Sequence, residues 1–117
     1  PATGKTLWRR DGPAPACSWT KESCTAAQIA ALTVVPGAIF GGFNDGWVRA
    51  FSTEDGSLLW ELDTARDFAT VNGIPARGGQ VSGYPVVVGR SALFVTSGAS
   101  SVERPGNALL VLTADAP

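Results

Sequence analysis

The sequence predicts an all-β fold in which antiparallel meanders of four short strands are repeated along the chain. Two observations carry this prediction. A glycine followed four residues later by tryptophan occurs at Gly4 and Trp8 and again at Gly56 and Trp60. A period of roughly 50 residues is the size of one unit in a repeat protein. Short apolar runs also alternate with glycine-rich turns along much of the chain, which is typical of many short strands.

The first complete meander is expected over residues 29–62. Its first three strands are predicted at 29–35, 38–42 and 47–52, separated by Pro36-Gly37 and by Asn44-Asp45-Gly46, which are turn signals. Asp45 is therefore expected in a turn. Asp55-Gly56 supplies the positive φ of a tight turn before a fourth strand that ends near Trp60.

The same order of elements begins again in the second half of the chain. Strands are predicted at 84–88, 91–96 and 107–113, so residues 84–117 form an incomplete unit, and residues 1–10 are expected to end a preceding one. Only residues 23–32 favour a short helix, because alanine and glutamine are frequent there.

Repeated four-stranded meanders predict the blades of a β-propeller, which closes with about four to eight blades. This chain holds about two blades' worth of strands, so we expect a fragment of a propeller. The remaining blades would come from further sequence, another chain or symmetry copies.

Composition argues against several kinds of partner and chemistry. Nine basic and ten acidic residues are dispersed and give a net charge of −1, so no nucleic-acid partner is expected. The apolar stretch 29–43 is interrupted by proline and glycine and is shorter than the about 20 residues that span a membrane. Histidine is absent, so this chain cannot supply a Ser-His-Asp triad.

The chain has two cysteines, Cys17 and Cys24, in a loop rich in proline, serine and threonine. A zinc site would need further ligands. The two cysteines are expected to form a disulfide, which favours an oxidising compartment such as the periplasm. The alternative is a pair of free thiols.

The spacing of Ala50, Gly56 and Trp60 resembles the tryptophan-docking motif of quinoprotein propellers, although Ser52 and Asp55 replace the usual residues at two places. In that family the tryptophan packs between neighbouring blades, a role that the resemblance implies for Trp8 and Trp60. The resemblance also implies a complete propeller of about seven or eight blades.

Residues 63–79, with 94–98 and 106–110, are similar to the C-terminal part of polyvinyl-alcohol dehydrogenase-like quinoproteins. The resemblance implies a periplasmic or secreted alcohol dehydrogenase with pyrroloquinoline quinone (PQQ) and calcium, and a cytochrome c as electron acceptor. The alternative is a non-catalytic propeller that binds proteins, such as an outer-membrane assembly factor.

In consecutive antiparallel strands, alternate loops lie on the same face. The loops expected on one face, at 11–28, 43–46, 63–83 and 98–106, are mostly long, whereas those on the other face are tight turns. Because binding residues concentrate on long loops, we expect the functional face on the long-loop side.

The best candidate loop is 63–83. The resemblance suggests carboxylate binding by Arg66 or Arg77 and a quinone or calcium contact for Asn72, with Asp67 as the base or a metal ligand. Close backbone approach to a flat ligand is expected at Gly78 and Gly79. Structural roles remain open for all of them: Asp67 can pair with either arginine, and Asn72-Gly73 can be an ordinary turn.

Overall fold

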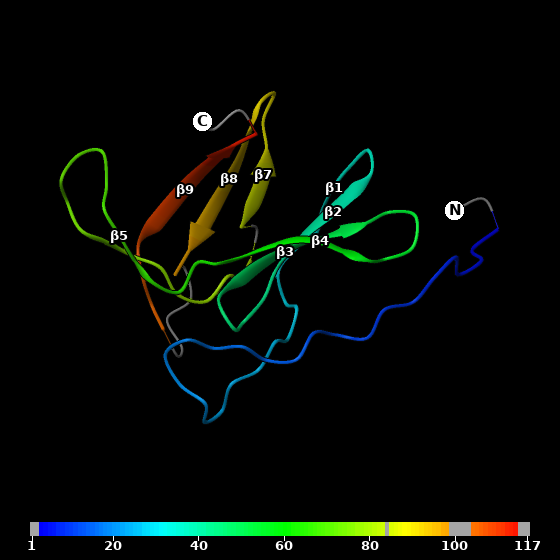
Figure 1. Ribbon diagram of the computed structural model, residues 1–117, viewed down its shortest axis with the longest axis horizontal. Coiled ribbons are helices and arrows are strands. Elements are labelled where there is room, and N and C mark those ends of the chain that lie inside the picture. Colours follow the sequence, from blue (N-terminus) through cyan, green and yellow to red (C-terminus); the bar gives the residue numbers. More distant parts are fainter. Residues whose placement is uncertain (1–2, 84, 99–103, 115–117) are drawn as a thin grey trace.

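The computed structural model describes residues 3–83, 85–98 and 104–114. Over these residues the protein contains nine β-strands and no helix, so the predicted all-β class is confirmed. The strands form a four-stranded sheet, a two-stranded hairpin and a three-stranded sheet (Figure 1).

The first sheet is an antiparallel meander of β1 (Thr33–Val35), β2 (Ala38–Gly42), β3 (Trp47–Ser52) and β4 (Leu58–Asp63). Its three turns contain Gly37, Gly46 and Gly56 at φ values of 86°, 85° and 73°, a region that side chains disfavour. Ala50 pairs with Trp60 and Phe51 pairs with Leu58. Leu59 is therefore an extra residue that forms a bulge in β4.

The second sheet is an antiparallel meander of β7 (Val86–Val88), β8 (Ala92–Ser97) and β9 (Ala108–Thr113). Its strands lie where the sequence predicts the first three strands of the incomplete unit. Along the chain, the segment between the two sheets contains β5 (Asp67–Phe68) and β6 (Ala76–Arg77). These two strands form a hairpin that projects away from both sheets (Figure 1).

The core lies between the two sheets. The buried side chains of Val48, Val81, Val86 and Val95 form one cluster, and Phe40, Leu93, Leu110 and Leu112 pack around it. Full burial of a valine contributes about 1.5–3 kcal/mol. The two sheets thus stack face to face through apolar side chains.

The prediction of a short helix at residues 23–32 is wrong, because this segment forms no helix. Its backbone groups bond to other parts of the chain: the Ala27 carbonyl accepts from the Asn44 N–H, and the Ala31 N–H donates to the Gly83 carbonyl. The Gln28 side chain bonds to the Ala30 carbonyl. Tertiary hydrogen bonds therefore replace the helical ones. The first strand is correspondingly shorter than predicted, since β1 begins at Thr33.

Residues 3–10 were expected to end a preceding unit, and they form no strand. A strand needs a partner for its ladder, and within the described residues none pairs with this segment. The segment runs along the first sheet instead.

Candidate functional site

The loops on one side of the two sheets are joined to one another by hydrogen bonds. The Thr64 N–H donates to the Gly46 carbonyl at 2.9 Å, and the Asn44 N–H donates to the Ala27 carbonyl at 3.0 Å. We call this side, made of residues 11–28, 43–46, 64–83, 98 and 104–106, the long-loop face. The opposite side carries the short turns at 36–37, 53–57 and 89–91.

A buried ion pair lies beneath the long-loop face. The Asp45 carboxylate accepts two hydrogen bonds from the Arg49 guanidinium, at 3.1 and 2.7 Å, and the two side chains are 0% and 3% exposed. The guanidinium lies 4.8 Å from the ring centroid of Phe43 and 5.6 Å from that of Trp47. It also contacts Glu61 at 3.3 Å. Asp45 is thus more than the turn residue that the sequence predicts.

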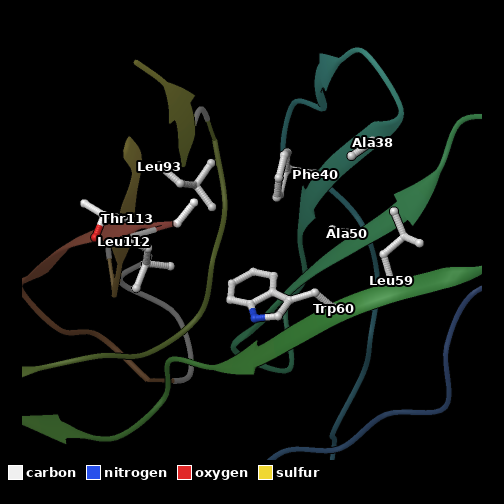
Figure 2. A pocket seen from close by; sticks show the side chains of 9 residues that line it. Ala38, Phe40, Ala50, Leu59, Trp60, Leu93, Leu112 and Thr113 are labelled. Atoms are coloured by element: carbon white, nitrogen blue, oxygen red, sulfur yellow. The ribbon is translucent and has the colours of Figure 1, made fainter. Parts of the chain in front are cut away.

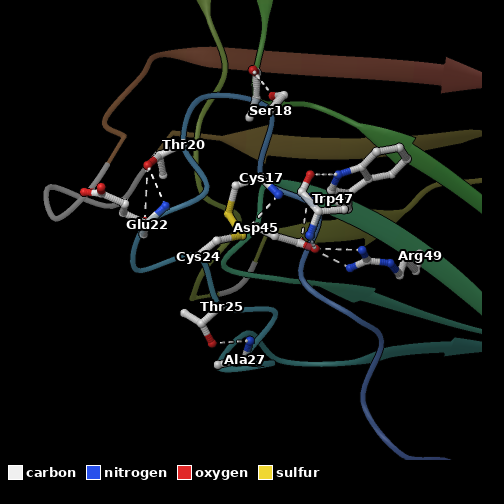
Figure 3. The surroundings of a disulfide bond; sticks show 12 residues. Cys17, Ser18, Thr20, Glu22, Cys24, Thr25, Ala27, Asp45, Trp47 and Arg49 are labelled. Atoms are coloured by element: carbon white, nitrogen blue, oxygen red, sulfur yellow. Dashed lines mark hydrogen bonds and ion pairs between the residues drawn. A yellow bond between two sulfur atoms is a disulfide. The ribbon is translucent and has the colours of Figure 1, made fainter.

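The cysteine loop is attached to this ion pair (Figure 3). Cys17 and Cys24 form the predicted disulfide. Next to it, the Ala16 N–H donates to Asp45 at 3.2 Å, and the Trp47 indole N–H donates to the Ala16 carbonyl at 2.9 Å. The disulfide and the ion pair together fix residues 16–24 over the end of the first sheet.

A second buried polar cluster joins the two sheets. The hydroxyls of Thr64 and Ser97 lie 2.7 Å apart, the Gly79 N–H donates to Ser97 at 2.9 Å, and Thr64 donates to the Gly46 carbonyl at 2.6 Å. Each hydroxyl has partners, as a buried polar group requires. The cluster fixes the backbone at the centre of the long-loop face.

The predicted ligand residues of loop 63–83 lie mainly on the hairpin. Asp67 is directly opposite Arg77 in the register, but the two side chains form none of the ion pairs found among the described residues. Arg66 precedes Asp67 and therefore lies on the other face of the hairpin, where its guanidinium is 4.7 Å from the ring centroid of Phe68. The two arginines thus do not converge on one point.

Asn72 lies at the tip of the hairpin, away from the other candidates. Its side-chain oxygen accepts from the Thr70 hydroxyl at 2.7 Å and from the Ile74 N–H at 3.2 Å. Gly73 follows with a φ of 76°. This is the geometry of an asparagine-glycine turn.

The backbone at Gly78 and Gly79 is packed against other backbone. A Cβ atom on Gly78 would lie 1.6 Å from the Thr64 carbonyl oxygen, and one on Gly79 would lie 1.9 Å from the Arg104 carbonyl oxygen. The space that these glycines leave is filled by the chain itself.

These placements decide whether the candidates fit one cofactor. PQQ carries three carboxylates on a flat ring system, so a site needs converging cations and an open flat surface. The arginines lie on opposite faces, Asn72 is at a tip, and the glycines are covered. Within the described residues there is also no cluster of three or more acidic or cysteine ligands for a metal ion. The candidates of this chain therefore do not converge on one point within the described residues.

The two tryptophans of the repeated motif, Trp8 and Trp60, have different surroundings. The Trp8 indole N–H donates to the Thr53 carbonyl at 2.9 Å, and its ring would lie 2.7 Å from a Cβ on Gly56. Trp60 points into a groove of about 470 Å³ between the two sheets, facing Leu93 and Leu112 (Figure 2).

Sequence reasoning missed the buried polar residues Arg49, Thr64 and Ser97, and it understated Asp45. The sequence offers a signal only for the ion pair of Asp45 and Arg49, because these opposite charges are four residues apart, at the turn and in the strand predicted after it.

No helix in the part of the chain that the structure describes is long and apolar enough to cross a membrane.

The comparisons with known proteins agree with this architecture. The family described as outer membrane protein assembly factor BamB, a PQQ-type repeat, matches residues 1–114. A polyvinylalcohol dehydrogenase of Pseudomonas sp. is 34% identical over 96% of this chain and 19% of its own length. A polyvinylalcohol dehydrogenase of Sphingopyxis sp. (strain 113P3) is 36% identical over 82% of this chain and 15% of its own length.

The chain thus spans about a fifth or less of the length of these curated relatives. From the family match over residues 1–114 and the two stacked antiparallel sheets, the chain belongs to the PQQ-repeat family of β-propeller proteins.

Proposed function

We propose that this chain forms adjoining blades of a PQQ-dependent dehydrogenase that oxidises alcohols of the polyvinyl-alcohol type in the periplasm or outside the cell. The observation that carries the proposal is the identity of 34% to a polyvinylalcohol dehydrogenase over 96% of the chain. The disulfide between Cys17 and Cys24 supports an oxidising compartment.

We propose a full blade over residues 29–62, an incomplete blade over residues 84–117 and the end of a preceding blade over residues 1–10. Trp8 and Trp60 are proposed to dock neighbouring blades against each other. The contact of Trp8 with the turn at Thr53–Gly56 supports this role.

Bound PQQ would accept hydride equivalents from the alcohol. Because the candidates on the hairpin do not converge, we propose that other blades provide most of the cofactor and calcium contacts. This chain would supply at most one guanidinium to a cofactor carboxylate. Arg66 is the better candidate, since Arg77 lies opposite Asp67. Asp67 lies beside Arg77 in the same register, and we propose no role for it as the catalytic base.

The second candidate function is a protein-binding scaffold, which the family description as an assembly factor favours. Such a protein would use the long-loop face for a protein partner and would bind no quinone. A cytochrome c as electron acceptor belongs only to the first proposal.

The experiment that separates the two is a titration of the full-length protein with PQQ and calcium, followed by tryptophan fluorescence. Saturable quenching at micromolar PQQ is expected for the dehydrogenase. Arg66→Ala should weaken PQQ binding several-fold, and the exposed control Arg90→Ala should not. No quenching in the wild-type protein would favour the scaffold.

A further inference from the structure

The tip of the β5–β6 hairpin carries an exposed asparagine followed by glycine. Asn72 and Gly73 are both exposed, and the hairpin projects away from both sheets (Figure 1). Apart from the chain neighbours of Gly73, no atom lies within 4 Å of the position that a Cβ on this residue would take. Water and hydroxide therefore reach the peptide bond between the two residues, and no side chain hinders the Gly73 nitrogen.

The side-chain carbonyl of Asn72 is held by two hydrogen-bond donors. Its oxygen accepts from the Ile74 N–H at 3.2 Å. It also accepts at 2.7 Å from the Thr70 hydroxyl, which lies 2.6 Å from the Ile74 carbonyl oxygen as well. The Ile74 N–H identifies the atom as the amide oxygen, because the amide nitrogen cannot accept. This bond closes a turn in which the side chain folds back over the Gly73 peptide.

The two donors lie where negative charge would develop if a nitrogen attacked Cγ of Asn72. The side-chain oxygen would become an oxyanion, and donors already fixed at that oxygen would stabilise it. The nitrogen nearest along the chain is that of Gly73, so the attack is intramolecular. Its N–H donates to the Thr70 carbonyl at 3.3 Å, which is longer than the usual N–H···O distance. The attacking atom is therefore only weakly engaged.

We propose that Asn72 is a site of intrinsic chemical modification, at which the folded turn promotes loss of the side-chain amide as ammonia. A solvent base removes the Gly73 amide proton, and the nitrogen bonds to Cγ of Asn72. The bond from Cγ to the side-chain nitrogen breaks as that nitrogen takes up a proton, which leaves a cyclic imide. Water then opens the imide, giving aspartate by cleavage at Cγ and isoaspartate by cleavage at the backbone carbonyl carbon. The sum is hydrolysis of an amide by water, with no oxidation or reduction.

The modification would place a charge on a part of the hairpin that has none. Residues 68–76 contain no acidic or basic side chain. Asn72 lines a groove of about 330 Å³ together with Val71, Ile74 and Leu109, so the new carboxylate would lie at this groove. The inference depends neither on PQQ binding nor on the proposed function.

The two other asparagines of the chain provide internal controls. Asn44 precedes the buried Asp45, and Asn107 precedes the buried Ala108. The Asn107 side-chain oxygen also accepts from the Arg77 N–H across the chain at 2.9 Å. Because a buried following residue reacts only on local opening, both asparagines should lose their amide at least about tenfold more slowly than the one at the tip.

The test is peptide mapping by chromatography and mass spectrometry of the purified full-length protein, incubated without PQQ in mildly alkaline buffer. The peptide that contains Asn72 should convert to aspartate and isoaspartate forms, with the mass change of an amide NH₂ replaced by OH. Thr70→Val should slow this conversion by about two- to tenfold, the effect of one hydrogen bond to the developing oxyanion. Val71→Ala keeps both donors and should leave the rate unchanged.

Faster conversion at Asn72 than at the other two asparagines, with a dependence on the Thr70 hydroxyl, supports the proposal. Retention of the Asn72 amide for as long as that of Asn107 would overturn it, and this comparison uses the wild-type protein alone. Equal or faster conversion in Thr70→Val would also overturn it, because the glycine alone would then account for the reaction. Failure of PQQ binding leaves these results unaffected, so the two proposals can fail separately.

Discussion

Replacing Asp45 by alanine should destabilise the protein strongly, because Arg49 would remain buried without its main partner. Removing one member of a buried ion pair costs about 3–5 kcal/mol. Arg49 keeps Glu61 at 3.3 Å, but Glu61 is 41% exposed, and a partly exposed pair is worth at most about 1 kcal/mol. The expected loss in the free energy of unfolding is therefore about 2–4 kcal/mol.

The assay is urea denaturation of the full-length protein, followed by tryptophan fluorescence, since Trp47 contacts both the ion pair and the cysteine loop. Glu61→Ala is the matched control and should lower stability by about 1 kcal/mol or less. Asp45→Ala combined with Arg49→Met should recover part of the loss, because it removes the uncompensated charge. A change below about 0.5 kcal/mol for Asp45→Ala would refute the reasoning.

Three further predictions concern the turns and the disulfide. In thermal unfolding, Gly56→Ala should lower the free energy of unfolding by about 2 kcal/mol more than Gly73→Ala. Both glycines have positive φ, but only a Cβ on Gly56 would meet the indole ring of Trp8. Equal effects of the two substitutions would show that the ring contact is unimportant. Replacing both cysteines by serine should lower the free energy of unfolding by about 2–3 kcal/mol, because the unfolded chain gains entropy when the loop is no longer closed. An unchanged midpoint of urea denaturation would contradict this. The Ser57 backbone N–H holds the pKa of Asp55 below its ordinary value of 3.8. This small stabilisation is present above that value and is lost as pH falls through the lowered pKa; an Asp55 pKa of 3.8 or higher in an NMR titration would contradict the turn geometry.

Local sequence signals predict the strands and turns of this fold well. Gly37, Gly46 and Gly56 lie at turns because only a residue without Cβ adopts their backbone geometry easily. The helix predicted at 23–32 fails because that prediction rested on propensity alone. The bonds of Ala27 and Ala31 to distant backbone groups are not visible in a local window.

The candidate site was less predictable than the fold. Loop 63–83 contains the expected polar residues, but the sequence does not reveal that Asp67 and Arg77 face each other across a hairpin. A pair of strands of two residues each is too short to give a periodic signal. The burial of Ser97 is equally hidden, because it depends on the stacking of two sheets.

The most direct test of the proposed function is alcohol-dependent dye reduction by the full-length protein after loading with PQQ and calcium. The account predicts that dye reduction requires PQQ, saturates with a secondary or polymeric alcohol, and persists in Asn72→Ala, because the Asn72 side-chain oxygen is already bonded to Thr70 and Ile74 within the turn. Full occupancy by PQQ without any alcohol-dependent reduction, or loss of activity in Asn72→Ala with unchanged stability, would contradict it.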